Sequence, residues 1–295
     1  MKTTFLCLLT LIFLSASLNG QSFNREIVPE GKSPVLLGKI NKEGLSNNSY
    51  ATWFEKNYSE YMPKEETVDQ LSSTLQGYTV TAFMGTWCGD SKREVPRFYK
   101  ILEAANFPLD RLTLIGVSRE RATYKQSPGG EEEGLNIHRV PTFIFYKDGR
   151  EINRIVEHPV NDLESDILQL LQGDYISNYH AVTVTANALE EMGVTKFRKK
   201  SKKLVPGLQK EAQKWSELNT LSYLLFLKGQ REESIAVAEL NIKLFPDEAG
   251  VYTSLANKLA QTGAKKEALA NYERAMALDP KNKQAQKGLA QLKKS

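Results

Sequence analysis

The middle of the chain alternates between short apolar runs and amphipathic stretches. The apolar runs are rich in β-branched and aromatic residues, and they predict strands at residues 78–84, 112–117, 142–146 and 151–156. Asp148-Gly149, between the last two runs, is typical of a hairpin turn. Apolar residues at three- and four-residue steps predict helices, which are expected at 91–105 and 163–171. This order of elements predicts an α/β domain.

A segment with a different pattern precedes this domain. Residues 21–40 contain Pro and Gly without a clear period and predict an extended lead-in. Aromatic residues then recur at helical spacing and predict a helix at about 47–61 with one buried aromatic face, made of Tyr50, Trp53, Phe54, Tyr58 and Tyr61. A short helix is predicted at 67–75. Residues 21–63 are therefore predicted to form an N-terminal extension.

No strand pattern recurs between about residue 175 and the C-terminus, where a 34-residue period is present instead. It relates Leu221 to Leu255 and Pro246 to Pro280. This period resembles that of tetratricopeptide repeats, each of which is a pair of helices. The second copy fits the repeat pattern best, through Tyr252, Leu255, Ala256, Leu259, Ala268, Tyr272, Ala275 and Pro280. An all-α repeat domain is predicted over residues 215–295.

Two copies are predicted, at about 215–248 and 249–282, with a capping helix at 284–292. Because roughly three repeats are normally needed for a stable stack, residues 174–214 are predicted to be a helical, basic linker or a degenerate repeat that supplies another layer. The alternative is that the α/β unit, and not another helical layer, covers the open end of the stack of two repeats. The stretch 196–203 holds six basic residues in eight, which is typical of a solvated face; a membrane or polyanion contact is the other interpretation.

The first twenty residues predict export. Lys2 supplies a positive charge, residues 5–14 are almost wholly apolar, and small residues follow up to Gly20. An apolar core of this length is too short to cross a bilayer of ~30 Å as a helix. Residues 1–20 are therefore predicted to be a secretory signal peptide, with an uncleaved anchor as the alternative. No second run of ~18 apolar residues follows, so no membrane span is expected after cleavage, and the protein is expected to be periplasmic or secreted.

Length, charge and cysteine content bear on the number of domains, on nucleic-acid binding and on disulfide formation. A chain of 295 residues with 41% hydrophobic residues argues for about two globular domains. A formal charge of +4 is too weak a bias to predict a nucleic-acid partner. Of the two cysteines, Cys7 lies in the predicted signal peptide, so cleavage leaves Cys88 alone. An exported chain with a single thiol has no internal disulfide, and its leftover cysteine is a candidate reactive group.

The sequence around Cys88 resembles a known redox site. Thr86-Trp87-Cys88-Gly89-Asp90-Ser91 follows a predicted strand and opens a predicted helix, as the Trp-Cys-x-x-Cys motif of thioredoxins does. Val140-Pro141-Thr142 stands directly before a later strand, as the cis-proline of that family does. The resemblance covers residues 64–173 and implies a thioredoxin-like domain. It also implies catalytic roles for Cys88 and Ser91 and a substrate-binding surface formed by Trp87, Gly89, Asp90, Val140 and Pro141.

Elementary electrostatics supports a reactive sulfur at this position. A helix N-terminus presents free N–H groups and a partial positive charge, which stabilise a thiolate, the nucleophile of disulfide exchange. Lys92 and Arg93 in the first turn favour the thiolate and Asp90 opposes it. The resemblance further implies that a cis Pro141 leaves the backbone at Val140 beside Cys88, free to pair with an extended substrate.

Two departures from the thioredoxin pattern change the expected chemistry. Ser91 occupies the position of the second, resolving cysteine, and a hydroxyl does not attack a mixed disulfide as a thiolate does. Ala82 stands six residues before Cys88, where many thioredoxins have an acid that deprotonates the resolving thiol. The dithiol cycle is therefore closed to this chain.

Three interpretations of Cys88 remain open: monothiol exchange or thiol capture, a structural thiol in a domain that only binds, and, least favoured, a metal ligand. His138, His158 and His180 complete no recognisable ligand set with it, so no metal site is predicted. No cofactor is predicted either. Ser91 is most simply a helix residue whose hydroxyl bonds the Cys88 sulfur.

The sequence thus predicts an exported thioredoxin-like protein that exchanges or captures thiols on polypeptide partners through Cys88, with the repeats as a protein-binding module. The alternative is a non-catalytic scaffold in which the thioredoxin-like domain only binds partners.

Overall fold

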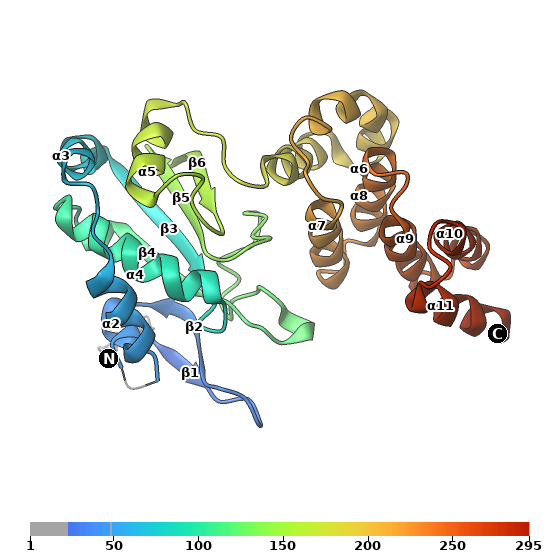
Figure 1. The fold of residues 1–295 in the computed structure, drawn as a ribbon, viewed down its shortest axis with the longest axis horizontal. Coiled ribbons are helices and arrows are strands. Elements are labelled where there is room, and N and C mark those ends of the chain that lie inside the picture. The colour runs from blue at the N-terminus through green and yellow to red at the C-terminus, as the bar shows by residue number, and fades with distance from the viewer. Residues whose placement is uncertain (1–22, 48, 295) are drawn as a thin grey trace, which may run out of the picture.

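The computed structural model describes residues 23–47 and 49–294, so the predicted signal peptide at residues 1–20 lies outside it. The chain forms an α/β region followed by a region of helices alone, and the two lie side by side (Figure 1). This agrees with the predicted fold class at the level of a mixed sheet region followed by many helices.

The strands of the described residues form one mixed sheet in the order β1-β2-β4-β3-β5-β6. β3 and β4 are parallel, and the other neighbours are antiparallel. The strands are β1 (Arg25–Ile27), β2 (Val35–Ile40), β3 (Tyr78–Met84), β4 (Leu112–Gly116), β5 (Thr142–Lys147) and β6 (Arg150–Val156). Strands β3 to β6 lie where the apolar runs predict them.

Residues 23–40, the described part of the predicted lead-in, are more ordered than predicted. They contribute β1 and β2, and β2 pairs with β4 inside the sheet. Val35, Leu36 and Leu37 are all buried, so β2 is covered on both faces and shows no polar–apolar alternation. A continuous apolar triplet beside Pro and Gly carries no period, which is why the pattern does not predict a strand.

One face of the sheet is covered by helices. Val80, Ala82 and Met84 of β3 point into a core that includes side chains of α2 to α5. These helices, with the short α1, are α1 (Lys42–Leu45), α2 (Ala51–Glu60), α3 (Glu65–Thr74), α4 (Gly89–Ala104) and α5 (Leu163–Gln172). The aromatic residues of α2 are part of this core: Phe54 contacts Tyr99 of α4 with ring centroids 5.9 Å apart. Of the five residues predicted to form the buried aromatic face, Tyr50 and Phe54 are buried, and the other three, Trp53, Tyr58 and Tyr61, are partly buried against the core.

The opposite face is covered by a loop. Phe83, Ile115 and Ile144 pack there with Ile137 and Val140, which belong to the segment between β4 and β5. This segment, residues 117–141, contains only the 3₁₀ turn Arg121–Thr123 as regular structure. It also lies next to the helical region, because a cavity of about 820 Å³ is lined by residues of both.

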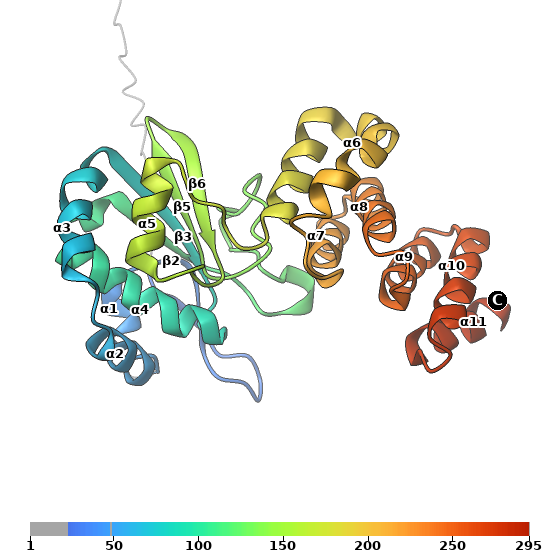
Figure 2. The same ribbon diagram turned by 45° about the horizontal axis from the view of Figure 1, so that its top comes forward.

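The helical region packs successive helices against one another (Figure 2). Its elements are α6 (His180–Leu208), α7 (Ser216–Leu227), α8 (Arg231–Leu244), α9 (Ala249–Gln261), α10 (Lys265–Leu278) and α11 (Lys283–Lys294). α6 is interrupted at Gly193, whose φ of +70° is outside the helical range. Within the described residues no helix has both the length and the apolar character to cross a membrane.

The seam between α9 and α10 gives a test of the helical packing. Ala268 is fully buried on α10, where it packs with Ala256 and Tyr272. Replacing Ala268 with Leu should overpack the seam and lower the free energy of unfolding by ~1–3 kcal/mol. Ala270→Leu, on the exposed side of the same helix, is the matched control and should change stability little. Equal thermal midpoints for the two variants would contradict the packing described.

Candidate functional site

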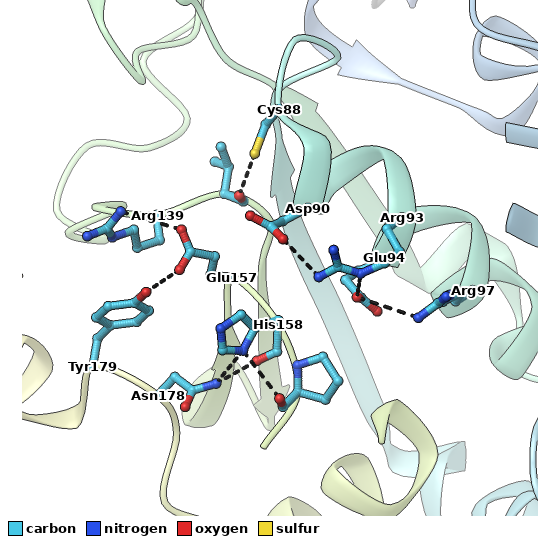
Figure 3. Close-up of polar contacts among 12 residues, drawn as sticks. Cys88, Asp90, Arg93, Glu94, Arg97, Arg139, Glu157, His158, Asn178 and Tyr179 are labelled. Carbon is cyan, nitrogen blue, oxygen red and sulfur yellow. Dashed lines mark hydrogen bonds and ion pairs between the residues drawn. The ribbon is translucent and has the colours of Figure 1, made fainter. Parts of the chain in front are cut away.

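Cys88 stands at the junction of β3 and α4, and it is half-buried. It is the N-cap residue of α4, with Lys92 N–H donating to its carbonyl at 3.0 Å. The thiol donates to the carbonyl oxygen of Val140 at 3.1 Å (Figure 3). The Val140–Pro141 peptide bond is cis, as the resemblance implies. The structure therefore brings together the two sequence motifs, which are about fifty residues apart.

Trp87, the residue before Cys88, packs against the same hydrophobic cluster as Cys88. Its indole N–H donates to the Val117 carbonyl at 2.9 Å, and its ring lies 5.8 Å from that of Tyr124. A Cβ at Gly85 would lie 2.5 Å from a ring carbon of Trp87, so glycine is needed there for the indole to pack. Gly89, by contrast, is exposed.

Ser91 is fully buried, and its hydroxyl oxygen accepts a hydrogen bond from Gly85 N–H at 3.2 Å. Within the described residues no hydrogen bond joins Ser91 to the Cys88 sulfur, which differs from the expected arrangement. This hydrogen bond satisfies the buried N–H of Gly85, which lies in the turn before α4. The Ser91 hydroxyl therefore stabilises that turn. Ala82 is buried in β3 and packs in the core.

The cationic side chains in the first turn of α4 interact with groups other than the Cys88 sulfur. Arg93 donates to Asp90 at 2.8 Å and also pairs with Glu94 (Figure 3). Lys92 lies over the ring of Trp53, with its ammonium 6.0 Å from the centroid. Since these cations already have partners, they contribute less to the sulfur than their position in the sequence suggests.

Lys125, which no sequence pattern singles out, adds a buried positive charge beside the segment that contacts Cys88. Its side chain is buried, and its ammonium donates to the carbonyl of His138, two residues before Val140. Burial, helped by the charge of Arg139, lowers the pKa of Lys125 to about 8, although the charges of Glu157 and Cys88 oppose this. No ion pair to Lys125 forms among residues 23–47 and 49–294. A lysine in a polar loop is expected to be exposed to solvent. No local sequence pattern could therefore have shown that Lys125 is buried.

The comparisons with known proteins agree with this geometry. The chain is 30% identical to a thioredoxin of Aspergillus fumigatus, Asp f 28, over 32% of this chain and 79% of that protein. It is 30% identical to a thioredoxin of Chlamydia trachomatis over 32% of this chain and 78% of that one. With a thioredoxin of Malassezia sympodialis it shares 31% identity, over 34% and 90% of the two chains. The chain belongs to the thioredoxin family.

No protein-family model matches the chain. Among solved structures, an HIV epitope scaffold with 18% identity aligns over 42% of this chain and 73% of its own at a TM-score of 0.27, a likeness too slight to bear on fold or function. The thioredoxin relatives cover about a third of the chain, so the helical region has no counterpart in those alignments.

The cis-proline segment of this thioredoxin-family protein is also tied to its helical region. Arg139 and Glu157 form an ion pair at 3.4 Å, and Tyr179, directly before α6, donates its hydroxyl to Glu157 (Figure 3). The Arg139 guanidinium lies 4.8 Å from the centre of the Tyr179 ring. The residue next to Val140 is thus held by the first residues of the helical region.

His138 is buried at this junction, with its ring 5.9 Å from that of Tyr179. Its Nε2 has no partner within the described residues. The described residues contain no group of three or more His, Cys, Asp or Glu arranged to hold a metal.

His138 makes the junction sensitive to acid. Burial lowers the pKa of His138 from 6.5 to about 3. Between about pH 6.5 and about pH 3, His138 is protonated in the unfolded chain and neutral in the folded chain. The free energy of unfolding therefore falls as the pH falls through that interval, by up to about 5 kcal/mol in total. His138→Phe keeps a ring against Tyr179 and should flatten this part of the pH profile of the free energy of unfolding. Identical profiles for the variant and the parent would contradict it.

Proposed function

We propose that this protein is an exported thiol-exchange protein in which Cys88 acts as a single attacking thiol on polypeptide partners. The observation that supports this best is the half-buried cysteine at the start of α4, placed against the Val140 carbonyl in a thioredoxin-family domain. In this proposal the thioredoxin-like domain spans about residues 64–173. The helix pairs over residues 215–295 are tetratricopeptide repeats that bind protein.

The proposed reaction stops halfway through a thioredoxin cycle. The Cys88 thiolate attacks one sulfur of a partner's disulfide, forming a bond between Cys88 and that sulfur. The old disulfide bond breaks, and its second sulfur leaves with the electron pair and takes a proton from water. Because Ser91 has no thiolate, release of the partner requires an external thiol, which attacks the mixed disulfide and is itself oxidised.

The residues around Cys88 are proposed to stabilise the thiolate, shield the sulfur and bind the partner. Lys125 is the cation proposed to stabilise the thiolate, because its ammonium donates to the carbonyl of His138, two residues before the Val140 carbonyl that Cys88 contacts. Trp87 shields the sulfur, and Gly89 and Asp90 form the adjoining partner surface. Val140 and Pro141 shape the groove for an extended partner segment. Ser91 is proposed to act through Gly85, by fixing the turn that carries Trp87 and Cys88.

A second candidate function is a scaffold whose thioredoxin-like domain binds partners without chemistry. The buried Ser91 favours it, because no second sulfur stands at the position from which a mixed disulfide would be resolved. Both candidates retain the proposed export by residues 1–20, and for both the partner is a polypeptide rather than a nucleic acid.

The rate and the stoichiometry of reaction with a disulfide reagent together test the two candidates. With excess dithiobis(nitrobenzoate), an attacking Cys88 should release one equivalent of coloured thiolate and keep the other half as a lasting mixed disulfide. Ser91→Cys restores a second sulfur, so this variant should release a second equivalent as the introduced thiol displaces the first adduct. Ser91→Ala should release only one. A Cys88 that reacts no faster in the native chain than in urea would favour the scaffold.

The cation proposed to face Cys88 can be tested separately. Lys125→Met removes the charge and should slow alkylation of Cys88 by iodoacetamide at pH 6.5 by several-fold, whereas Lys125→Arg keeps a charge and should preserve more of the rate. Lys147→Met, at the exposed end of β5, is the matched control and should have no effect. Equal rates for Lys125→Met and the parent would remove Lys125 from the proposed mechanism.

A further inference from the structure

The second half of α6, residues 194–208, concentrates positive charge on one helix. We call it the basic segment. It follows the break at Gly193, at the edge of the helical region (Figure 2), and it holds six basic residues and no acidic one. Outside it, acidic residues outnumber basic ones, so the chain owes its net positive charge of +4 to this segment. A modest total charge therefore hides a strongly charged helix.

One side of the basic segment packs on the helical region. Phe197 and Ser201 are buried on this side. Arg198 forms ion pairs with Glu232 at 2.6 Å and with Glu239 at 3.2 Å, both on α8. The side that faces α8 therefore has the buried residues, and the one basic residue that pairs with acids is Arg198.

The other five basic residues of the segment are exposed lysines: Lys196, Lys199, Lys200, Lys202 and Lys203. Their ammonium groups form no ion pair or hydrogen bond with any described residue. At 3.6 residues per turn they all lie on the side of the helix away from Phe197. Like charges four residues apart, as at Lys196 and Lys200, destabilise a helix, so folding does not explain this face.

An apolar hollow adjoins these lysines at the break in α6. Its volume is about 420 Å³, and it is lined by Met192, Gly193, Val194, Thr195, Lys196 and Lys199. Met192 and Val194 are partly buried against the core of the helical region. Gly193 has no side chain, and its φ of +70° takes the backbone out of the helix. Two apolar side chains are thus placed beside two ammonium groups.

We propose that the basic segment docks on the surface of an anionic phospholipid bilayer, with its lysines at the headgroup phosphates and the hollow against the apolar part of a lipid. Exposed lysines without acidic partners are attracted to anionic lipid. A partner that also fits apolar side chains beside them combines negative charge with apolar groups, as a phospholipid does. The contact is peripheral, since the lysines lie on one face of a helix that packs on the protein.

Nucleic acid matches this face less well. Single strands bind through bases that stack on exposed aromatic rings, and the one aromatic residue of the basic segment, Phe197, is fully buried. A duplex has no apolar chain to place in the hollow. The inference goes beyond thiol exchange and does not depend on the reactivity of Cys88.

Co-sedimentation of the full chain with lipid vesicles tests the docking. One set of vesicles is phosphatidylcholine alone, and the other has equal parts of phosphatidylcholine and phosphatidylglycerol. Any binding through the apolar residues 5–14 is common to both sets, so tighter binding to the anionic vesicles supports the proposal. Equal binding to both sets, or to neither, overturns it. Binding of an oligonucleotide without binding of anionic vesicles also overturns it and identifies a nucleic-acid partner.

A double variant of the basic segment makes the test specific. Lys199→Gln with Lys203→Gln should weaken binding to anionic vesicles about 25-fold, or about five-fold for each lysine near an anionic surface. Since the two lysines are exposed and repel each other, the thermal midpoint should not fall, which separates lost docking from misfolding. Lys265→Gln with Lys266→Gln, at the exposed start of α10, removes the same charge and is the matched control. Equal affinities of the two double variants overturn the assignment.

The contribution of the hollow is tested by Val194→Thr, which makes part of its lining polar. This variant should bind anionic vesicles about four-fold more weakly, the effect of one buried methyl group. Unchanged affinity would overturn the role of the hollow.

Iodoacetamide alkylation of Cys88 keeps this proposal apart from thiol exchange. The alkylation rate of the variant with Lys199→Gln and Lys203→Gln should equal that of the parent. Docking on anionic vesicles by a protein with an inert Cys88 would support the basic segment and refute thiol exchange. A reactive Cys88 in a protein that binds no vesicles would do the reverse.

Discussion

The geometry of the candidate site depends on two backbone carbonyls in the segment that precedes β5. The carbonyl of His138 accepts from the Lys125 ammonium, and that of Val140 accepts from the Cys88 thiol. Lys125 and Cys88 come from different segments, yet each bonds the same three-residue stretch. The position of this stretch therefore affects both the cover over the sulfur and the placement of the Lys125 ammonium.

The same stretch connects the thioredoxin-like domain to the helices. Arg139, between the two carbonyls, pairs with Glu157 and lies over the ring of Tyr179 at the start of α6. Tyr179 in turn donates to Glu157. A shift of α6 relative to the sheet would disturb these contacts and, through the backbone of Arg139, the carbonyl on which the thiol rests. The carbonyl that Cys88 contacts is thus joined to the start of the helical region by a continuous set of direct contacts.

Local patterns predicted the elements well and the environment of the sulfur poorly. Strands β3 to β6 and helices α4 and α5 follow from their periodicity, and the contact of Cys88 with Val140 follows from the family resemblance. β2 was missed because burial on both faces removes alternation. Lys125 was missed because a lysine in a polar loop is buried only by long-range contacts, which no local pattern encodes. The hydroxyl of Ser91 was assigned to the sulfur, but the backbone of Gly85, six residues earlier, is its partner.

The loop that covers the second face of the sheet links the thiol site to the helical region. Tyr124 packs on Trp87 and Lys125 binds the segment beside Cys88, and both residues line the cavity that the loop shares with α6 and α7. In the proposed reaction Ser91 does not release the partner, so the mixed disulfide would persist until an external thiol attacks it. The cover over the sulfur, to which both this loop and the helical region are joined, would then decide which partners reach Cys88.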